Sequence, residues 1–218
     1  MYRVNDIFYS LQGEGFWTGT PMVFLRLAGC NLRCPFCDTD FSASREMTAP
    51  EIIEALNAAH PSLPGSRRIC ITGGEPALQL DAPLIEALHQ ANYTIHLETN
   101  GTRPIPAGID WVTISPKEDF CLSGPAKGDG HPRADVVLPH ADELKLVYTG
   151  GNDPEKWLSF PARHFFLQPC DPGEICPADG GDFRPSESVD TVSATLRYIL
   201  SHPRWRLSLQ THKILGIA

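Results

Sequence analysis

The first half of the chain alternates short β-forming runs with amphipathic helical runs, and this order limits the folds that it can adopt. Residues 68–76, RICITGGEP, have the apolar and β-branched residues of a strand and end in a glycine turn. Residues 82–91, APLIEALHQA, repeat apolar side chains at helical spacing, and residues 94–101, TIHLETNG, are typical of a following strand. Strand–helix–strand order of this kind favours a mostly parallel α/β sheet.

Two further helices are expected. The segment 48–60 begins with Thr48, has Pro50 in its first turn and has Glu51 three residues after the threonine, which is a helix-capping pattern. The segment 187–202 has an apolar stripe at helical spacing, so one face of this helix should be buried. The members of the stripe are Val189, Val192, Leu196 and Ile199.

The remaining β-forming runs outnumber the helices. Strands are expected at 22–29, 110–117, 141–148, 163–170 and 205–213. The segments 101–109 and 118–139 are too short or too rich in proline and glycine for crossover helices. The sequence therefore predicts six or seven strands, about six of them parallel, with about three main helices.

The length of the chain sets the number of domains. A chain of 218 residues and 24.0 kDa can bury an extensive core, and no linker interrupts it, so residues 1–218 are expected to form one domain. Parallel sheets place their functional sites at the carboxyl ends of the strands. The residues expected to converge there are Cys30, Gly73, Asn100, Ser115 and Gln168.

Charge and hydropathy exclude some classes of partner. The formal net charge is −8 and the isoelectric point is about 5.4, opposite to the basic surface that grips a phosphate backbone. Direct binding to nucleic acid is therefore not expected. The first residues lack the pattern of a secretory signal, and no run approaches the ~18 apolar residues of a membrane span. We expect a cytoplasmic protein that does not enter a membrane.

Three of the seven cysteines, Cys30, Cys34 and Cys37, fall within eight positions. They are too close together for a disulfide framework, so metal or redox chemistry is favoured. Three soft thiolates can hold an iron–sulfur cluster and leave one iron without a protein ligand. The alternative is a structural zinc site, which requires a fourth ligand from a histidine or another cysteine. The candidates for that cysteine are Cys121, Cys170 and Cys176.

The segment CNLRCPFC, with Phe36 before its last cysteine, and the later GGEP turn resemble the radical S-adenosylmethionine (SAM) enzymes. The resemblance implies a 4Fe-4S cluster on the three cysteines, with SAM bound to the fourth iron. Gly73 and Gly74 allow the backbone to approach the methionine part of SAM because they lack a Cβ. Taken alone, GGEP is explained equally well as a turn at the end of a strand.

A set of motifs along nearly the whole chain closely resembles the 7-carboxy-7-deazaguanine synthases. They are SLQGEG, FLRLAGCNLRCPFCDTDF, ITGGEP, LETNGT, ISPK, LQPCD and QTHKILGI. The resemblance implies the radical ring contraction of 6-carboxy-5,6,7,8-tetrahydropterin, with loss of ammonia, in queuosine or deazapurine biosynthesis. It also implies an abbreviated, modified (β/α) barrel, Mg2+, a homodimer, and a flavodoxin- or ferredoxin-type electron donor.

The same resemblance implies roles for individual residues. Thr39 is the expected magnesium ligand, whereas DTD at 38–40 taken alone is typical of a solvated turn. Arg26 can offer a fork of donors to the substrate carboxylate, and strand alternation points it away from its apolar neighbours. The expected substrate-binding residues are Leu11, Gln12, Gly13, Arg26, Thr72, His212 and Ala218. The expected SAM-binding residues are Phe36, Gly74, Glu75, Glu98, Ser115, Pro116, Lys117, Gln168, Pro169, Cys170 and Asp171.

Two other functions remain open from the sequence. A glycyl-radical-enzyme activase has the same cysteine spacing, but it requires a docking surface for a partner protein. A zinc-binding interaction module would use the cysteine loop for structure alone.

Overall fold

The computed structural model describes the chain except for residues 35, 41–42, 62–66, 118–134, 172–189 and 218. The described strands form one curved sheet in the order β3-β1-β2-β4-β5-β6-β7-β8-β9. Their bounds are β1 Tyr2–Leu11, β2 Pro21–Leu27, β3 Arg45–Met47, β4 Arg67–Gly73, β5 Tyr93–Thr99, β6 Trp111–Ile114, β7 Ala141–Tyr148, β8 Ala162–Pro169 and β9 Arg206–Leu207. Neighbours from β2 to β9 pair in parallel, which confirms the predicted parallel sheet.

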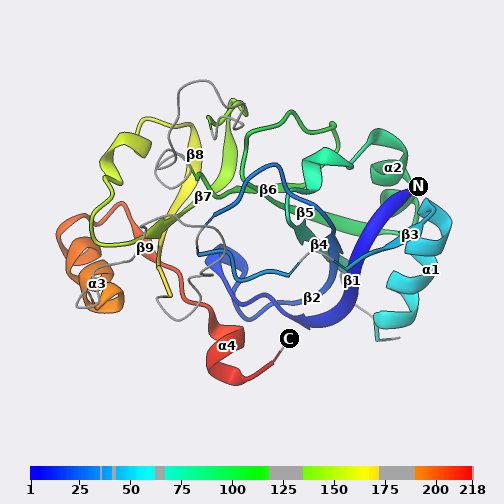
Figure 1. Ribbon diagram of the computed structural model, residues 1–218, viewed down its shortest axis with the longest axis horizontal. Coiled ribbons are helices and arrows are strands. Elements are labelled where there is room, and N and C mark those ends of the chain that lie inside the picture. The colour runs from blue at the N-terminus through cyan, green and yellow to red at the C-terminus, as the bar shows by residue number, and fades with distance from the viewer. Residues whose placement is uncertain (35, 41–42, 62–66, 118–134, 172–189, 218) are drawn as a thin grey trace.

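The helices lie outside this curved sheet. α1 Ala49–Ala59 and α2 Ala82–Gln90 cover one end of it, and α3 Thr191–Ser201 covers the other (Figure 1). The capping pattern of α1 is confirmed, because the Thr48 side chain accepts a hydrogen bond from the Glu51 amide while the Glu51 carboxylate accepts one from the Thr48 amide. With fewer helices than parallel strands in the described residues, the fold is an abbreviated (β/α) barrel.

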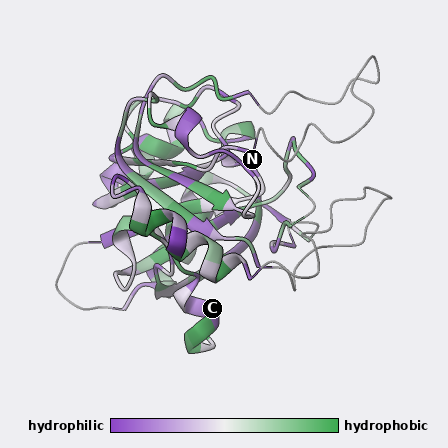
Figure 2. Ribbon diagram, turned by 90° about the vertical axis from the view of Figure 1, so that its left-hand side faces the viewer, coloured by the Kyte–Doolittle hydropathy of each residue, from purple (hydrophilic) through white to green (hydrophobic). Residues whose placement is uncertain are grey.

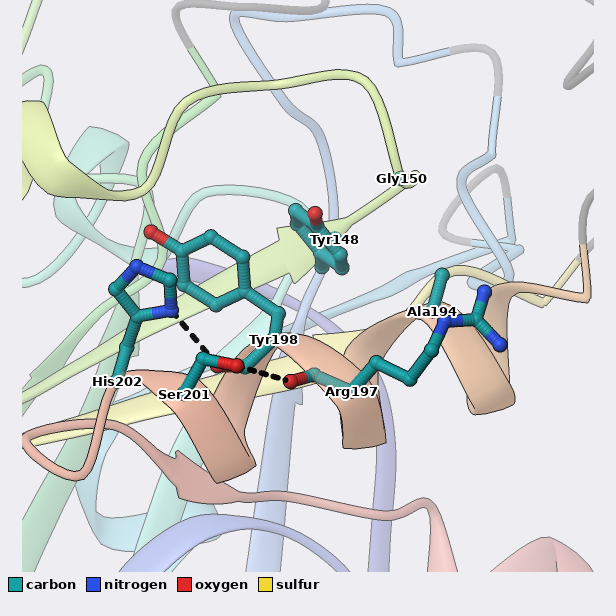
Figure 3. Close-up of a pocket in the computed structure, with 7 residues that line it drawn as sticks. All are labelled: Tyr148, Gly150, Ala194, Arg197, Tyr198, Ser201 and His202. Atoms are coloured by element: carbon teal, nitrogen blue, oxygen red, sulfur yellow. Dashed lines mark hydrogen bonds between the residues drawn. The ribbon is translucent and has the colours of Figure 1, made fainter.

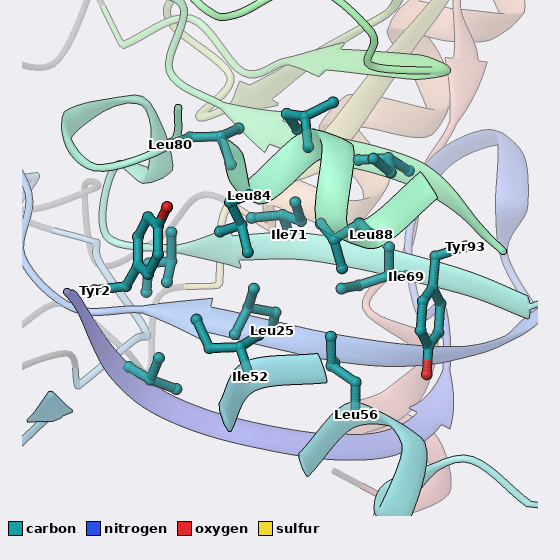
Figure 4. Close-up of a cluster of buried hydrophobic side chains, with 14 of the residues drawn as sticks. Tyr2, Leu25, Ile52, Leu56, Ile69, Ile71, Leu80, Leu84, Leu88 and Tyr93 are labelled. Carbon is teal, nitrogen blue, oxygen red and sulfur yellow. The ribbon is translucent and has the colours of Figure 1, made fainter. Parts of the chain in front are cut away.

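The main apolar core lies between the sheet and the first two helices. Ile52 and Leu56 of α1 and Leu84 of α2 are fully buried against Leu25 and Ile71 of the sheet (Figure 4). These strand residues alternate with residues of the opposite face, which points into the barrel. Burial of each such side chain contributes about 1.5–3 kcal/mol before the cost of ordering the chain. The core fixes the strands, and the strands place the interior side chains.

The N-terminal strands are where the sequence-based prediction is incomplete. β1 pairs antiparallel with β2, and β3 pairs antiparallel with β1, and neither strand was predicted. β1 alternates weakly, with most of its side chains half-buried or exposed, so its pattern is not distinctive. It becomes a strand because β2 offers an unpaired edge.

The predicted strand at 205–213 is wrong beyond its first residues. Only β9 is extended, and α4 Thr211–Leu215 follows it. The Thr211 amide and hydroxyl both donate to the Gly13 carbonyl oxygen, at 3.0 and 2.9 Å, which turns the chain away from the sheet. α4 stands out from the body with an apolar end, where Ile214 is 72% exposed (Figure 2).

The apolar stripe predicted for the last long helix is also partly wrong. Val192 and Leu196 are 47% and 42% exposed, whereas Thr191 and Thr195 are buried. The Thr191 hydroxyl donates to the Cys170 carbonyl oxygen at 2.7 Å, and this contact orients α3 so that Ile199 faces the sheet whereas Val192 and Leu196 do not. Val189 lies outside the described residues.

The loop after β1 closes the open side of the barrel against the C-terminal segment. The Gly15 amide donates to the Ser208 hydroxyl at 3.0 Å. Gly15 has a φ of +65°, and a Cβ there would overlap the Glu143 carboxylate, so glycine is required.

Among the described helices, none is long and apolar enough to cross a membrane.

Candidate active site

The cysteine loop and the GGEP turn lie together at the carboxyl ends of β2 and β4. The Gly74 amide donates to the Leu27 carbonyl oxygen at 3.2 Å, and the Glu75 amide donates to the Gly29 carbonyl oxygen at 2.9 Å. A Cβ on Gly74 would overlap the Gly29 carbonyl group. The glycine is therefore needed for the close approach of the two loops, which brings the GGEP backbone beside Cys30.

Asn100 joins this assembly from the end of β5. Its side-chain amide donates to the Asn31 side chain at 3.1 Å, and Asn31 donates to the Thr102 hydroxyl at 2.8 Å. The Ser115 amide donates to the Thr99 carbonyl oxygen at 2.8 Å. The predicted convergence of strand ends is thus observed for β2, β4, β5 and β6.

The three clustered cysteines are half-buried on one loop and form no disulfide. Burial raises the pKa of Cys30 to about 11 and also raises the pKa of Cys37, and the neighbouring Cys34 thiol adds to both effects. Since metal binding requires the thiolate, loading this loop would release protons. In the described part of the chain, no three His, Cys, Asp or Glu side chains converge on one metal ion. A structural zinc site needs four such ligands, each at about 2.0–2.3 Å from one ion. The cysteines that hold an iron–sulfur cluster each bind a different iron, so they need not converge on one point.

Glu75 ties the site together from within. Its side chain is fully buried. Its carboxylate accepts hydrogen bonds from the Thr99 hydroxyl and the Asn100 backbone amide, both at 2.7 Å, and from the Ala77 backbone amide at 2.9 Å. Burial raises the pKa of Glu75 even though these donors act in the opposite direction. The carboxylate is thus engaged by the protein, and its predicted contact with SAM stays a prediction.

We expect Glu75→Ala to lower the free energy of unfolding by about 2–3 kcal/mol, because three donors would lose a charged acceptor inside the protein. Urea denaturation followed by circular dichroism measures the change. Glu86→Ala is the matched control, since Glu86 is an exposed residue of α2 and alanine is a good helix former. Equal stability of the two variants would contradict this role for Glu75.

The polar side chains inside the barrel form a second group. Arg26 of β2 is paired in register with Thr72 of β4, and its guanidinium donates to the Thr39 hydroxyl at 3.1 Å. The Thr72 hydroxyl donates to one Glu98 carboxylate oxygen at 3.2 Å, and the Gln12 amide donates to the other at 3.0 Å. Gln12 and Thr72 therefore share Glu98 as their acceptor, and Arg26, in register with Thr72, extends this interior network to Thr39.

Residues from β6 and β8 border the same region. The Lys117 ammonium donates to the Ser115 carbonyl oxygen at 2.8 Å and to the Ser115 hydroxyl at 2.5 Å. The positive charge of Lys117 opposes the rise in the pKa of Cys37 and of Glu75 that burial causes. Pro116 lies between these two residues and is buried. Phe36 packs against Val147 and Cys170 beyond the end of β8.

The C-terminal segment reaches the site through Asp38. Its carboxylate accepts hydrogen bonds from the Gln210 amide at 2.8 Å and from the Lys213 ammonium at 3.1 Å. Burial acts against ionisation, but these donors lower the pKa of Asp38. The His212 ring lies against Gly13, where a Cβ would overlap it. The loop after β1 and α4 thus meet beside the cysteine loop.

Some predicted residues lie farther from this centre or outside the described chain. Leu11 is paired with Pro21 at the amino end of β2, opposite to the cysteine loop. Pro169 is the last residue of β8, and Asp171 lies 3.9 Å from Lys213 at the edge. Ala218 lies outside the described residues, as do Cys121 and Cys176.

Glu14, Glu143 and Lys145 are interior residues that the sequence-based analysis did not select. The Lys145 ammonium forms an ion pair with the Glu14 carboxylate and lies 3.9 Å from that of Glu98. The Glu143 carboxylate accepts a hydrogen bond from the Phe16 amide at 3.0 Å. The signal was present in ADELKLVY, where Glu143 and Lys145 alternate with apolar residues and so share the interior face.

A separate pocket of about 340 Å3 lies on the outer face of the sheet, between the end of β7 and α3 (Figure 3). Its lining residues are Tyr148, Gly150, Ala194, Arg197, Tyr198, Ser201 and His202. Tyr148 belongs to the outer face of β7, whereas Lys145 and Glu143 face the interior. Of the predicted site residues that the structure describes, none lines this pocket, so the interior network is the candidate active site.

Comparison with known proteins identifies relatives along the whole chain. The Radical SAM superfamily profile matches residues 25–119. A 7-carboxy-7-deazaguanine synthase of Bacteroides thetaiotaomicron is 43% identical over 217 residues, covering 100% of this chain and 99% of the relative. One of Bordetella pertussis is 39% identical, with 99% of each chain covered. The crystal structure of QueE from Escherichia coli aligns with a TM-score of 0.66 at 23% identity, covering 95% of this chain and 93% of that one, which shows the shared fold.

Proposed function

Because the chain belongs to the 7-carboxy-7-deazaguanine synthase family of radical SAM enzymes, we propose that it catalyses the ring contraction of 6-carboxy-5,6,7,8-tetrahydropterin to 7-carboxy-7-deazaguanine, with loss of ammonia. The observation that carries this proposal is the 43% identity to a synthase over the full length of both chains. The product would enter queuosine or another deazapurine pathway. A radical SAM enzyme binds a 4Fe-4S cluster and SAM, and the three soft thiols of the cysteine loop suit such a cluster.

We propose that Cys30, Cys34 and Cys37 hold the cluster. The cluster and SAM together supply a radical that can remove a hydrogen atom from a carbon of the substrate. The backbone of Gly74, held against the cysteine loop, and the Ser115 and Gln168 side chains at the ends of β6 and β8 bind and orient SAM in this proposal. The other proposed SAM contacts are Phe36, Glu75, Pro116, Lys117, Pro169, Cys170 and Asp171.

We propose that the pterin lies against the interior network. The Arg26 guanidinium can bind the substrate carboxylate as a fork, with Thr39 beside it. The side-chain amide of Gln12 and the hydroxyl of Thr72 both donate to Glu98, and these bonds support a proposed contact of Glu98 with the pterin in place of the predicted contact with SAM. His212 beside Gly13 is the proposed contact on the C-terminal side, and the proposed roles of Leu11 and Ala218 are unchanged.

The molecular setting completes the proposal. We propose one domain over residues 1–218, a cytoplasmic homodimer, a flavodoxin- or ferredoxin-type electron donor, and no direct contact with nucleic acid. The acidic net charge of −8 supports the last point, since a phosphate backbone would be repelled.

Anaerobic reconstitution tests the function. The protein is loaded with iron and sulfide, reduced, and incubated with SAM, Mg2+ and the tetrahydropterin, and the products are followed by mass spectrometry. We expect 7-carboxy-7-deazaguanine and ammonia in equal amounts, with SAM recovered unchanged. Absence of the deazaguanine from a protein that has bound both the cluster and SAM would refute the proposal. Glycyl-radical formation on a partner would support an activase, and a colourless zinc-loaded protein would support the interaction module.

Thr39→Ala should weaken the stimulation of the reaction by Mg2+ and leave iron content unchanged, because it removes a hydroxyl oxygen but no thiol. Substitution of residues that only support a metal ligand already lowers metal affinity by roughly tenfold. Loss of the ligand itself should therefore lower the apparent affinity for Mg2+ by at least this factor. Initial rates over a magnesium titration measure it. Thr39→Ser retains the hydroxyl and should retain the wild-type response. Identical magnesium curves for the alanine variant and the wild type would remove Thr39 from the site.

A further inference from the structure

Lys145 is a buried cation in the wall of the candidate active site. It lies on β7, is 5% exposed, and points to the barrel interior, whereas its neighbours Leu144 and Leu146 face the outer core. Its ammonium group forms an ion pair with Glu14 and lies 3.9 Å from Glu98. These partners come from the loop after β1 and from β5, so Lys145 connects both to β7.

The charges around Lys145 favour the ionised form of its ion-pair partner Glu14. Burial alone would lower the pKa of Lys145, but the carboxylates of Glu14, Glu98 and Glu143 raise it above its ordinary value. Burial opposes ionisation of Glu14, yet Lys145 lowers the pKa of that carboxyl. Burial raises the pKa of Glu143 to about 7, so this group is partly protonated at neutral pH. Of the carboxyl groups around it, Glu14 is thus the one that Lys145 holds in the ionised form through a direct ion pair.

On one side of Lys145, the Glu14 carboxylate accepts hydrogen bonds from two side-chain amides. Its second carboxylate oxygen accepts hydrogen bonds from the Gln168 amide at 3.1 Å and from the Gln210 amide at 3.0 Å. The Gln210 amide also donates to Asp38 beside Thr39. The ion pair therefore fixes the orientation of amide groups from β8 and from the C-terminal segment.

On the other side, Glu98 holds the residues proposed to contact the pterin. Its two carboxylate oxygens accept hydrogen bonds from Gln12 and Thr72, at 3.0 and 3.2 Å. A carboxylate can accept both donors at once, one on each oxygen. The position of the Glu98 carboxylate thus sets which groups of Gln12 and Thr72 face the interior.

We propose that Lys145 is a positioning residue for the pterin: its ammonium group holds the Glu14 and Glu98 carboxylates so that Gln12, Thr72 and Glu98 present a fixed set of donors and acceptors to the substrate. The inference rests on the proposed function and deepens it. It differs from a merely stabilising ion pair, because it requires the affinity for substrate to depend on the charge of Lys145.

Equilibrium binding of the tetrahydropterin to the cluster- and SAM-loaded, unreduced protein tests this proposal without turnover. In the wild type, the dissociation constant should change little between about pH 6.5 and 8.5, since Lys145 holds the pKa of the Glu14 carboxyl below its ordinary value. In Lys145→Met, the Glu14 carboxylate loses its cation, so its burial raises the pKa and the group takes up a proton at low pH. The dissociation constant should rise about tenfold at low pH and recover as the pH is raised.

Two further variants separate positioning from folding. Glu14→Gln/Lys145→Met removes both members of the ion pair, so it should fold more readily than the single variant and still bind the pterin weakly. Lys156→Met, at an exposed site, is the control and should bind as the wild type does. Wild-type affinity in Lys145→Met or in the double variant would overturn the proposal, and so would loss of folding in both.

The outcomes for the two proposals are distinct. If the proposed function is wrong, the wild type itself binds SAM but neither binds nor converts the tetrahydropterin. If only the role of Lys145 is wrong, the wild type forms the deazaguanine and Lys145→Met binds the pterin equally well at every pH. Iron content and SAM binding are measured in parallel, so that damage to the cysteine loop is recognised.

Discussion

Cys30→Ala is expected to abolish turnover, with a fall of at least ~10^3-fold, because no ordinary acid–base route is open to the ring contraction at neutral pH. A cluster needs soft thiolate ligands, and alanine leaves a second iron of the cluster without a protein ligand. The reconstituted variant should lack the brown iron–sulfur absorbance and contain little iron. The same protein should keep its fold, since Cys30 is only half-buried on a loop.

The matched control for this experiment is Cys70→Ala. Cys70 is a fully buried thiol of β4 whose pKa is raised well above its ordinary value by burial, so it is unsuited to ligation. The Cys70→Ala variant should retain the iron content of the wild type while losing some stability. Wild-type iron in Cys30→Ala, or loss of iron in Cys70→Ala alone, would contradict the proposed ligand set.

The order of the sheet was predictable because local patterns carry it. The segments that became β4, α2 and β5 each have a period that their own residues define, and parallel pairing follows from their order. β1 and α4 were missed because contacts distant in sequence create them. β1 needs the edge of β2, and α4 has only five residues, too few to be stable without its contacts to Gly13 and Asp38.

The candidate site divides in the same way. Residues at strand ends, such as Cys30 and Asn100, were expected to meet because parallel strands share one edge. The pairing of Lys145 with Glu14 spans 131 positions, and a charged residue is rarely buried unless such a partner is present. Glu14 meets Lys145 only because the loop after β1 crosses the open side of the barrel.

Arg26→Met is expected to lower kcat/KM for the tetrahydropterin by about 100-fold, because a bidentate, charge-assisted contact with a carboxylate would be lost. Most of the effect should appear in KM, since the carboxylate is present in both the ground state and the transition state. Arg26→Lys should lie between the two, because a lysine keeps the charge but not the planar fork. Arg163→Met is the control, since its side chain is 75% exposed and pairs with Asp142 at the surface.

A second comparison assigns the loss to the carboxylate itself. Arg26 also donates to Thr39, so its removal disturbs that hydroxyl and, with it, the proposed magnesium site. A tetrahydropterin without the 6-carboxylate separates the two effects when its binding is measured without turnover. If Arg26 binds the carboxylate, wild type and Arg26→Met should bind this analogue equally. If Arg26 acts only through Thr39, the variant should lose affinity for both ligands alike, and added Mg2+ should restore it, which would make Arg26 a support for the metal rather than an anchor for the substrate.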